Sequence, residues 1–313
     1  MNDIILVTGS SGLVGSALKL IQNVEMIFLT RKDGDLRDPF VVNKIFKRFR
    51  PRKVIHLAAS VGGVKSNMRK SADYFFDNMM INLNVFKAAH NVGTEKILAY
   101  MSTCVFPDAA HYPLSENQLH NGPPHESNFG YAYAKRMIEV QARAYRKQYG
   151  MRCVVAIPAN IYGPHDNFDL QNGHVLPAII HRMYLAKRLN SSITVWGSGK
   201  PLREFVFSKD IARLSIWAME NYNEESPIIF SSGKEDSIRT VVEVLCTSMQ
   251  FEGEVLFDET QPDGQHRKPS DGSRLGLILP NFSWTNLEEG LKSTVSWFTE
   301  NFKSARGVSH EYN

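Results

Sequence analysis

The 313-residue chain contains only three cysteines, and their spacing excludes the two commonest structural uses of this residue. Cys104, Cys153 and Cys246 form no Cys-x-x-Cys pair and belong to no Cys/His cluster, so we expect neither a disulfide framework nor a structural zinc site. No apolar run approaches the ~20 residues of a membrane-spanning helix, and Ile4–Thr8 is too short for a signal peptide. We therefore expect a soluble cytoplasmic protein that binds no metal ion.

The chain also lacks a concentrated charge of either sign. Its 36 basic and 32 acidic residues give a net charge of +4, and basic runs are as short as Lys47-Arg48. Nucleic acid is therefore not expected as a partner, whereas a small anionic ligand suits this balance. The contents of 43% hydrophobic and 22% charged residues are typical of a globular protein.

The first half of the chain alternates short apolar runs with segments of helical length, which is typical of a parallel sheet covered by helices. The predicted strands are Ile4–Thr8, Met26–Thr30, Lys53–Ala58, Lys96–Ser102 and Arg152–Ile157. The predicted helices are Leu13–Gln22, Phe40–Phe49, Ala72–His90 and Tyr131–Tyr149. This order predicts a Rossmann-type, doubly wound α/β fold whose strand carboxyl ends share one ligand-binding edge.

Beyond Pro158 loop signals predict a smaller C-terminal α/β substrate lobe. Its predicted helices are 175–189, 209–222, 240–249 and 287–302, and its predicted strands are 193–195, 228–230 and 255–257. We expect a cofactor domain over 1–160, a mainly substrate-binding lobe over 161–303 and a flexible tail over 304–313. A strand and a helix between 203 and 232 can return to the first domain.

A glycine-rich turn follows the first predicted strand and opens the first helix. It is formed by Gly9, Ser10, Ser11, Gly12, Leu13, Val14 and Gly15. Glycines there let the backbone approach a pyrophosphate closely, and the helix N-terminus attracts its charge. The turn therefore predicts a dinucleotide site.

The end of the second strand decides which dinucleotide is bound. An acidic residue there would bind a ribose 2′-hydroxyl, whereas this strand is followed by Arg31 and Lys32, which suit a 2′-phosphate. We therefore expect NADP(H), although Asp33 lies close enough to leave NAD open. Asp35 with Leu36 is expected near the adenine, and Ala58 near the middle of the cofactor.

Ser102-Thr103-Cys104 ends the fourth predicted strand, and Tyr131 and Lys135 lie four residues apart on the following helix. Four-residue spacing points both side chains the same way. A lysine ammonium lowers the pKa of a nearby phenol, and the pair can relay a proton to a substrate oxygen during hydride transfer.

These motifs resemble the extended short-chain dehydrogenase/reductase family, matching it at Gly9, Gly12, Gly15, Ser102 or Thr103, Tyr131 and Lys135. Further segments resemble, nearly end to end, the branch of that family that epimerises and reduces GDP-4-keto-6-deoxy-D-mannose. They are 102–107, 121–125, 163–168, 172–177, 195–199, 262–264 and 267–268.

The resemblance implies that Cys104 is the base and His174 the acid for epimerisation at C3 and C5, whose protons a 4-keto group acidifies. Chemistry alone leaves His165 as a competitor of His174. The resemblance also implies that Tyr131 donates a proton during reduction at C4, that Ser102 hydrogen-bonds the developing alkoxide, and that Lys135 holds the nicotinamide ribose. Further cofactor contacts are implied for Pro158, Ala159, Asn160, Ile161 and His174.

By the same resemblance, the GDP-sugar is bound by Arg182, Trp196, Arg203, Asp263 and Lys268. Cationic side chains suit a diphosphate, and an aromatic surface suits a base. A core role for Trp196 stays equally open.

We also expect a homodimer through helices 72–90 and 131–149. Both helices keep a second apolar strip, including Phe76 with Met80 and Ile138 with Ala142. The resemblance implies that they pair across a two-fold axis as a four-helix bundle.

Three other functions compete with this interpretation. A 4,6-dehydratase of the same fold usually carries Asp-Glu after the Ser/Thr, where this chain has Cys104-Val105. A 4-epimerase would keep its nicotinamide unchanged over a cycle. A non-catalytic NADP-binding regulator would tend to lose the tyrosine or the lysine, and this chain has both.

Overall fold

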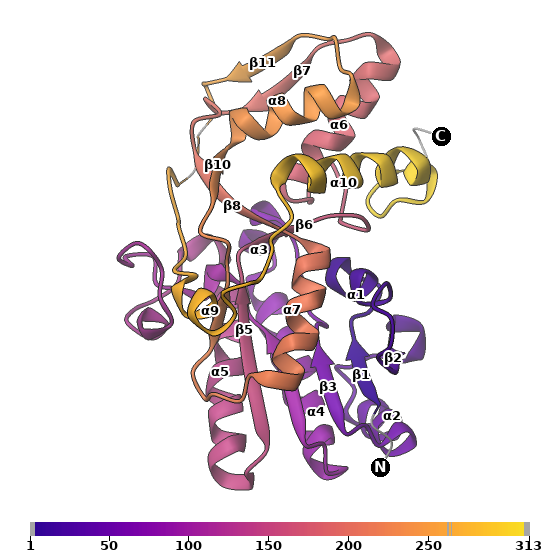
Figure 1. Ribbon diagram of the computed structural model, residues 1–313, viewed down its shortest axis with the longest axis vertical. Helices are drawn as coiled ribbons and strands as arrows, with labels where there is room; N and C mark the ends of the chain where they lie inside the picture. Colours follow the sequence, from indigo (N-terminus) through magenta and orange to yellow (C-terminus); the bar gives the residue numbers. More distant parts are fainter. Residues whose placement is uncertain (1–3, 262, 264, 310–313) are drawn as a thin grey trace.

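The computed structural model describes residues 4–261, 263 and 265–309, which form a large sheet with helices on both faces and a smaller lobe beyond one edge (Figure 1). The strands of the large sheet are β1 (Ile5–Thr8), β2 (Met26–Phe28), β3 (Lys53–His56), β4 (Lys96–Tyr100), β5 (Arg152–Pro158) and β9 (Ile228–Phe230). They lie in the order β2-β1-β3-β4-β5-β9, and every neighbouring pair is parallel. The predicted doubly wound α/β fold is confirmed.

Each face of this sheet buries the apolar stripe of several helices. One face packs against α2 (Pro39–Phe49), α4 (Ser71–Asn91) and α5 (Phe129–Tyr149), the other against α1 (Leu13–Leu18) and α7 (Ser208–Asn221). Local signals fix the ends of these helices. The Asp38 carboxylate, for example, accepts hydrogen bonds from the backbone N–H groups of Phe40 and Val41 and so caps α2.

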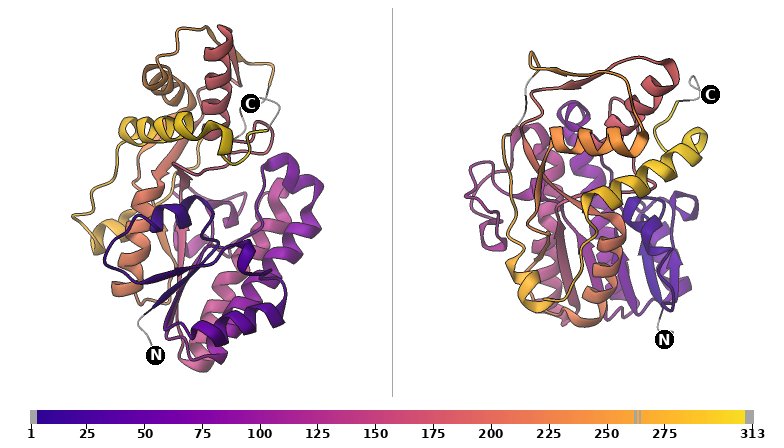
Figure 2. Two further views of the ribbon diagram at one scale, coloured as in Figure 1. Left: turned by 90° about the vertical axis from the view of Figure 1, so that its right-hand side faces the viewer. Right: turned by 45° about the horizontal axis from the view of Figure 1, so that its top comes forward.

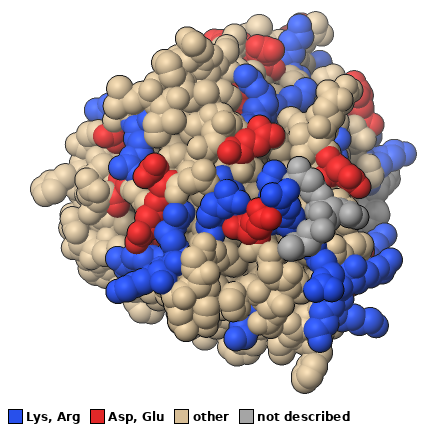
Figure 3. Space-filling model, turned by 60° about the horizontal axis from the view of Figure 1, so that its bottom comes forward, with Lys and Arg blue, Asp and Glu red and all other residues tan. Residues whose placement is uncertain are grey.

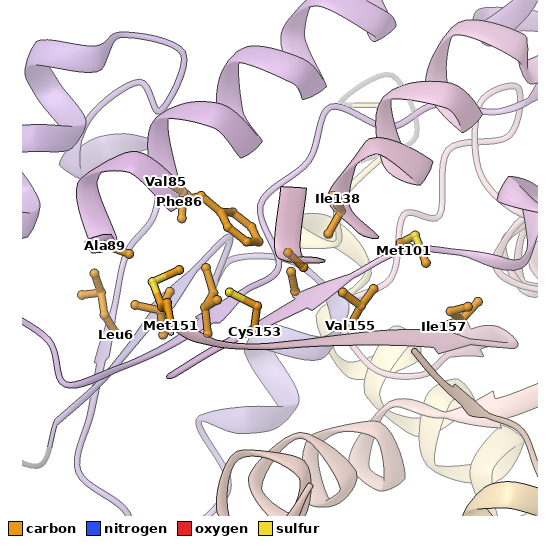
Figure 4. Packing of buried hydrophobic residues seen from close by; sticks show 14 of the residues in the cluster. Leu6, Val85, Phe86, Ala89, Met101, Ile138, Met151, Cys153, Val155 and Ile157 are labelled. Carbon is orange, nitrogen blue, oxygen red and sulfur yellow. The ribbon is translucent and has the colours of Figure 1, made fainter. Parts of the chain in front are cut away.

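The core between the sheet, α4 and α5 consists of almost completely buried apolar side chains (Figure 4). Phe86 of α4 and Ile138 of α5 pack there with Cys153 of β5. Our assignment of Ile138 and Ala142 to an outer apolar strip was wrong, because they are only 0% and 4% exposed. The sequence shows which residues of a helix are hydrophobic. Whether they face the core or the surface depends on how the neighbouring helix packs.

The smaller lobe has its own core. Its helices are α6 (Val175–Leu189), α8 (Ile238–Met249) and α10 (Leu287–Asn301), and its parallel strand pair is β7 (Ile193–Trp196) with β11 (Val255–Asp258). Five short elements were not predicted: α3 (Val64–Arg69), β6 (Asn160–Tyr162), β8 (Leu202–Phe207), β10 (Glu235–Ser237) and α9 (Ser273–Ile278). Strands β10, β8 and β6 form a separate sheet in that order.

The chain crosses between the two parts more than once. After forming β7 and β8 in the smaller lobe, it returns to the large sheet as α7 and β9.

We expected a flexible tail from residue 304, but Ala305 is buried and the Phe168 N–H donates to the Arg306 carbonyl over 2.8 Å. Residues 310–313 of that tail lie outside the described residues.

The smaller lobe stands over the carboxyl edge of the large sheet in both views of Figure 2. On the face shown in Figure 3, Lys and Arg side chains lie in several groups separated by acidic and uncharged residues. Of the helices within the described ranges, none has the length and hydropathy needed to cross a membrane.

Ligands of doubly wound sheets bind at the carboxyl ends of the strands. The candidate site residues are therefore expected at the edge between the large sheet and the smaller lobe.

Candidate functional site

At Gly9 and Gly15 the turn after β1 is packed against its surroundings so closely that no side chain fits. Gly9 has a φ of +69°, and a Cβ there would lie 2.6 Å from the Ala58 backbone nitrogen. A Cβ on Gly15 would lie 2.4 Å from the Ser10 Cα, so α1 begins directly against the turn. Gly12 stands at the N-cap of α1. This compact geometry leaves exposed backbone beside a helix start, as a pyrophosphate requires.

The carboxylates of the loop after β2 are hydrogen-bonded to groups of the same loop. Asp33 Oδ2 accepts from the Thr30 N–H over 2.7 Å and from the Thr30 hydroxyl over 2.9 Å, and these bonds lower the pKa of Asp33. Asp35 is held by Arg37 at 2.6 Å. Arg31 is exposed next to this loop. The loop therefore offers a cation to a ligand, while both nearby carboxylates are engaged.

Asn84 of α4 holds the segment that is expected to face the adenine. Its amide donates to the Leu36 carbonyl over 3.1 Å and to the Arg37 carbonyl over 2.9 Å. Arg37 also reaches Asp77 of α4 at 2.9 Å. The position of Asp35 and Leu36 is therefore set by α4, a contact that sequence reasoning did not anticipate.

Cys104 lies on a single 3₁₀ turn, Thr103–Val105, which begins where β4 ends. The Val105 N–H donates to the Ser102 carbonyl over 3.0 Å and closes this turn. Burial raises the pKa of the Cys104 thiol, against a hydrogen bond from Ser102 and the charges of Lys268 and Lys135. The thiol thus shares one electrostatic environment with both lysines.

Lys135 is 4% exposed on α5, and burial lowers its pKa to about 8. We expected its charge to lower the pKa of Tyr131. Instead the pKa of Tyr131 is raised, because burial of the phenol dominates and a negative charge on Cys104 adds to it. Tyr131 is therefore protonated in the free protein, the form that can donate a proton.

A neutral polar network, missed from the sequence, supports Lys135. His56, at the end of β3, lies 2.8 Å through Nδ1 from the Thr8 hydroxyl and 3.1 Å through Nε2 from Asn82 Oδ1. Burial, followed by the Lys135 charge, lowers the pKa of His56 to about 3. Asn82 also donates to the Ala134 carbonyl over 3.5 Å, so the network links β1, β3, α4 and α5.

His174 and His165 occupy different environments. His174 is exposed at the N-cap of α6, whereas the His165 ring lies 4.3 Å from the Trp297 ring in the smaller lobe. Asp166 next to it is buried with no hydrogen-bond partner for Oδ2 among the described residues. Burial raises the pKa of Asp166 to about 6, and the His174 charge opposes this rise. His174 thus has a buried carboxyl group nearby that the sequence did not reveal.

The backbone at the end of β5 leads from the large sheet into β6. The Ala159 N–H donates to the Phe230 carbonyl over 3.0 Å, and the Asn160 amide donates to the Glu204 carbonyl over 2.8 Å. Pro158 is the last residue of β5, and Ile161 belongs to β6. This segment is thus fixed from both sheets.

Trp196 is 53% exposed, so the alternative of a core role is wrong. The Lys65 ammonium lies 4.9 Å and the Arg182 guanidinium carbon 5.8 Å from the centre of its ring. Lys65, on α3, had no role in the sequence interpretation. An exposed aromatic face flanked by cations offers stacking and charge to a nucleotide.

The remaining predicted substrate residues lie on β8 and on the segment after β11. Burial lowers the pKa of Arg203 and of Lys268. The Asp263 charge opposes this effect at Arg203, and the Cys104 charge opposes it at Lys268. The Asp263 carboxylate accepts from the Ser198 N–H over 2.6 Å and from its hydroxyl over 2.7 Å. Pro262 and Gly264, part of the same motif, lie outside the described residues.

The geometry defines a dinucleotide-binding α/β fold with buried titratable side chains at the carboxyl edge of its large sheet, and comparison with known proteins agrees with this fold. Residues 5–233 match the model of the NAD dependent epimerase/dehydratase family, and the chain belongs to this family.

Among individual relatives, the chain is 42% identical over 310 residues to a GDP-L-fucose synthase of Dictyostelium discoideum, covering 96% of this chain and 97% of the relative. It is 37% identical to the GDP-L-fucose synthase of Escherichia coli K12, covering 97% and 98%. A crystal structure of a GDP-L-fucose synthetase from Naegleria fowleri bound to NADP superposes with a TM-score of 0.93 at 41% identity, covering 97% and 95%.

The raised pKa of Cys104 gives a testable prediction. Iodoacetamide, which reacts with the thiolate, should modify Cys104 at a rate whose pH profile has its midpoint above pH 9.0, the ordinary pKa of a cysteine thiol. Lys268→Met should slow modification at fixed pH by roughly 3- to 10-fold, because the ammonium favours the thiolate. Mass spectrometry of the Cys104 peptide measures this, with the exposed Lys292→Met on α10 as control. Equal rates in Lys268→Met and the unmodified sequence would contradict the assignment.

Proposed function

We propose that the protein converts GDP-4-keto-6-deoxy-D-mannose into GDP-L-fucose, by epimerisation at C3 and C5 followed by NADPH-dependent reduction at C4. The names of the relatives support this activity. The observation that carries it is the placement of Cys104 in one electrostatic environment with Lys135 and Lys268. A thiol held beside buried cations suits proton abstraction, and a simple reductase has no use for it.

NADP(H) fits the residues at the sheet edge. The turn from Gly9 to Gly15 would hold the pyrophosphate, and exposed Arg31 the 2′-phosphate. Asp35 and Leu36 would lie at the adenine, Ala58 at the middle of the cofactor, and Lys135 with residues 158–161 and His174 at the nicotinamide end. The NADP bound to the Naegleria fowleri protein supports this choice. When bound, NADPH supplies the hydride for C4.

In the proposed epimerisation, the Cys104 thiolate removes the proton next to the ketone, and His174 returns a proton on the opposite face. The 4-keto group stabilises the resulting enolate, and the Lys268 and Lys135 charges favour both thiolate and enolate. The carboxyl group of Asp166 is buried, which raises its pKa, and the charge of His174 opposes this rise, so the two groups interact. The two acid–base residues thus approach the sugar from different elements, the turn after β4 and the start of α6.

In the proposed reduction, Tyr131 donates its proton to the C4 oxygen while Ser102 hydrogen-bonds that oxygen. The raised pKa of Tyr131 keeps its proton in place until a stronger base, the C4 alkoxide, develops. Lys135 supplies positive charge during this proton transfer. The His56 network holds the part of α5 that carries Lys135 in position.

We assign the GDP-sugar to the smaller lobe. Trp196 with Arg182 would bind the base and phosphates, and Arg203, Asp263 and Lys268 the rest of the nucleotide and the sugar. Residues 1–160 with α7 and β9 would then form the cofactor domain, and the remainder up to 303 mainly the substrate lobe.

The decisive test of the activity is a coupled measurement of cofactor and product. NADPH should be oxidised in a one-to-one ratio with GDP-4-keto-6-deoxy-D-mannose, and GDP-L-fucose should appear by chromatography against a standard. A 4-epimerase or a dehydratase would consume no net NADPH. Turnover of another nucleotide sugar, with no absorbance change in this assay, would refute the proposal.

Two substitutions should separate the two steps. Tyr131→Phe should lower hydride transfer by about 100-fold or more, yet leave deuterium incorporation at C3 or C5 from heavy water detectable. Cys104→Ser should reduce that incorporation by a similar factor without weakening NADPH binding. Mass spectrometry measures the exchange, and cofactor fluorescence the binding. If exchange vanishes in Tyr131→Phe, or if Cys104→Ser loses exchange and cofactor binding equally, these roles are wrong.

We further propose a homodimer through α4 and α5, which lie side by side along the large sheet (Figure 2). Phe75, Phe76 and Leu83 expose 43%, 61% and 44% of their surface on α4, and Val140 exposes 36% on α5. An apolar surface of this size on two long helices favours association with a second copy. These residues replace Ile138 and Ala142 in the proposed interface. We also propose a cytoplasmic location, which the absence of paired cysteines among Cys104, Cys153 and Cys246 favours.

Light scattering tests the dimer. The protein should have twice the mass of one chain at micromolar concentration, and Leu83→Glu should shift it toward the mass of a single chain, because the charge would be buried in the interface. Phe40→Glu, at an 85% exposed position on α2, should leave the mass unchanged. A single-chain mass for the unmodified protein would refute the proposal.

A further inference from the structure

Arg136 is only 4% exposed although it directly follows Lys135 on α5. Its Nε and Nη2 donate to the Val105 carbonyl over 2.9 and 2.5 Å, and its Nη1 donates to the Gly122 carbonyl over 2.7 Å. The guanidinium carbon lies 5.1 Å from the centre of the Tyr133 ring. One buried side chain therefore holds two separate loop segments against the helix that carries Tyr131 and Lys135.

The Val105 carbonyl is a significant attachment point because it belongs to the last residue of the 3₁₀ turn that bears Cys104. Strand β4 fixes the start of this turn, and Arg136 fixes its end. Val105 and Phe106, the residue that follows the turn, are fully buried, so the turn has little room to move. The place of the thiol relative to α5 is thus determined by Arg136.

The electrostatics agree with this geometry. The hydrogen-bond acceptors of Arg136 are neutral carbonyls, and burial lowers its pKa, with Tyr133 and Cys104 as the charges that oppose this effect. A buried cation that is bonded to neutral acceptors still favours a nearby anion. The thiolate of Cys104 is such an anion.

We propose that Arg136 is a positioning residue for epimerisation: its planar fork fixes the Cys104 turn to α5 and so sets the distance from the thiol to the sugar held over Tyr131 and Lys135. The inference rests on the proposed function, since it concerns the proton-transfer step of that reaction. Reduction at C4 depends mainly on Tyr131 and Lys135 of α5, and Ser102, which would hydrogen-bond the C4 oxygen, stands before the turn and not at the end that Arg136 holds. Loss of the fork should therefore affect the two steps unequally.

The chain offers a matched control. Arg146, on the same helix, also donates from its guanidinium to backbone carbonyls, those of Cys153 and Glu224 over 3.0 and 3.2 Å, far from the Cys104 turn along the helix. If Arg136 only stabilises α5, its substitution should affect deuterium exchange no more than substitution of Arg146. If Arg136 positions the Cys104 turn, its substitution should slow exchange and that of Arg146 should not.

The experiment measures deuterium incorporation at C3 and C5 of GDP-4-keto-6-deoxy-D-mannose in the Tyr131→Phe protein. Adding Arg136→Met should lower the exchange rate by about 100-fold, the effect of a reacting group displaced by ~1 Å. Arg136→Lys keeps the charge but loses the fork, and should recover only part of the rate. Arg146→Met should leave the rate unchanged, and NADPH binding should be unchanged in every variant.

The outcomes are separable. Unchanged exchange in Arg136→Met, or an equal loss in Arg146→Met, would overturn the inference. If Arg136→Met does not fold, Arg136→Lys decides, because full exchange in that variant would show that the fork is not needed. A Tyr131→Phe parent that shows no exchange would refute the separate roles of Tyr131 and Cys104, and the inference with them, whereas the proposed function itself fails only if the unmodified protein forms no GDP-L-fucose.

Discussion

The site depends on the burial of positive charge at the carboxyl edge of the large sheet. Lys135 and Lys268 lose hydration there, and burial lowers the pKa of each. The charge that opposes this effect at Lys135 comes from the Cys104 thiolate. Cations in such an environment gain most from an anion that arrives or develops beside them. The thiolate, the substrate enolate and the C4 alkoxide would each be such an anion.

Buried cations can be held at this edge because neutral groups fix them in place. The Thr8–His56–Asn82 network contributes no opposing charge, since burial keeps the imidazole uncharged. Arg136 likewise uses neutral carbonyls as partners. A carboxylate in either position would neutralise the cations that the reaction needs. Neutral partners supply rigidity and leave the positive charge available to the substrate.

Features that depend on neighbouring residues in the chain could be predicted, whereas features that depend on tertiary contacts could not. The glycine turn from Gly9 to Gly15 has a local signature, because its glycines recur at fixed spacing between a strand and a helix, whereas the contact of Gly9 with Ala58 is tertiary. Strands β6 and β10 have only three residues each, and β8 lies between them in the sheet, so all three gain their stability from pairing and their sequences carry little signal. The exposure of Leu83 and the burial of Ile138 depend on how α4 and α5 pack. The raised pKa of Tyr131 depends on burial that no spacing reveals.

With the roles proposed for Cys104 and Tyr131, the coupling between them would explain how epimerisation and reduction can share one pocket. A negative charge on Cys104 raises the pKa of Tyr131, so the phenol holds its proton most firmly while the thiolate is ready to act as a base. In the proposed reaction the thiolate takes a proton from the sugar and His174 returns one to the enolate, after which neither Cys104 nor the sugar carries a negative charge. Without an anion beside it, the phenol releases its proton more easily. This coupling would make the proton for C4 available only after epimerisation and would so favour the order of the two steps.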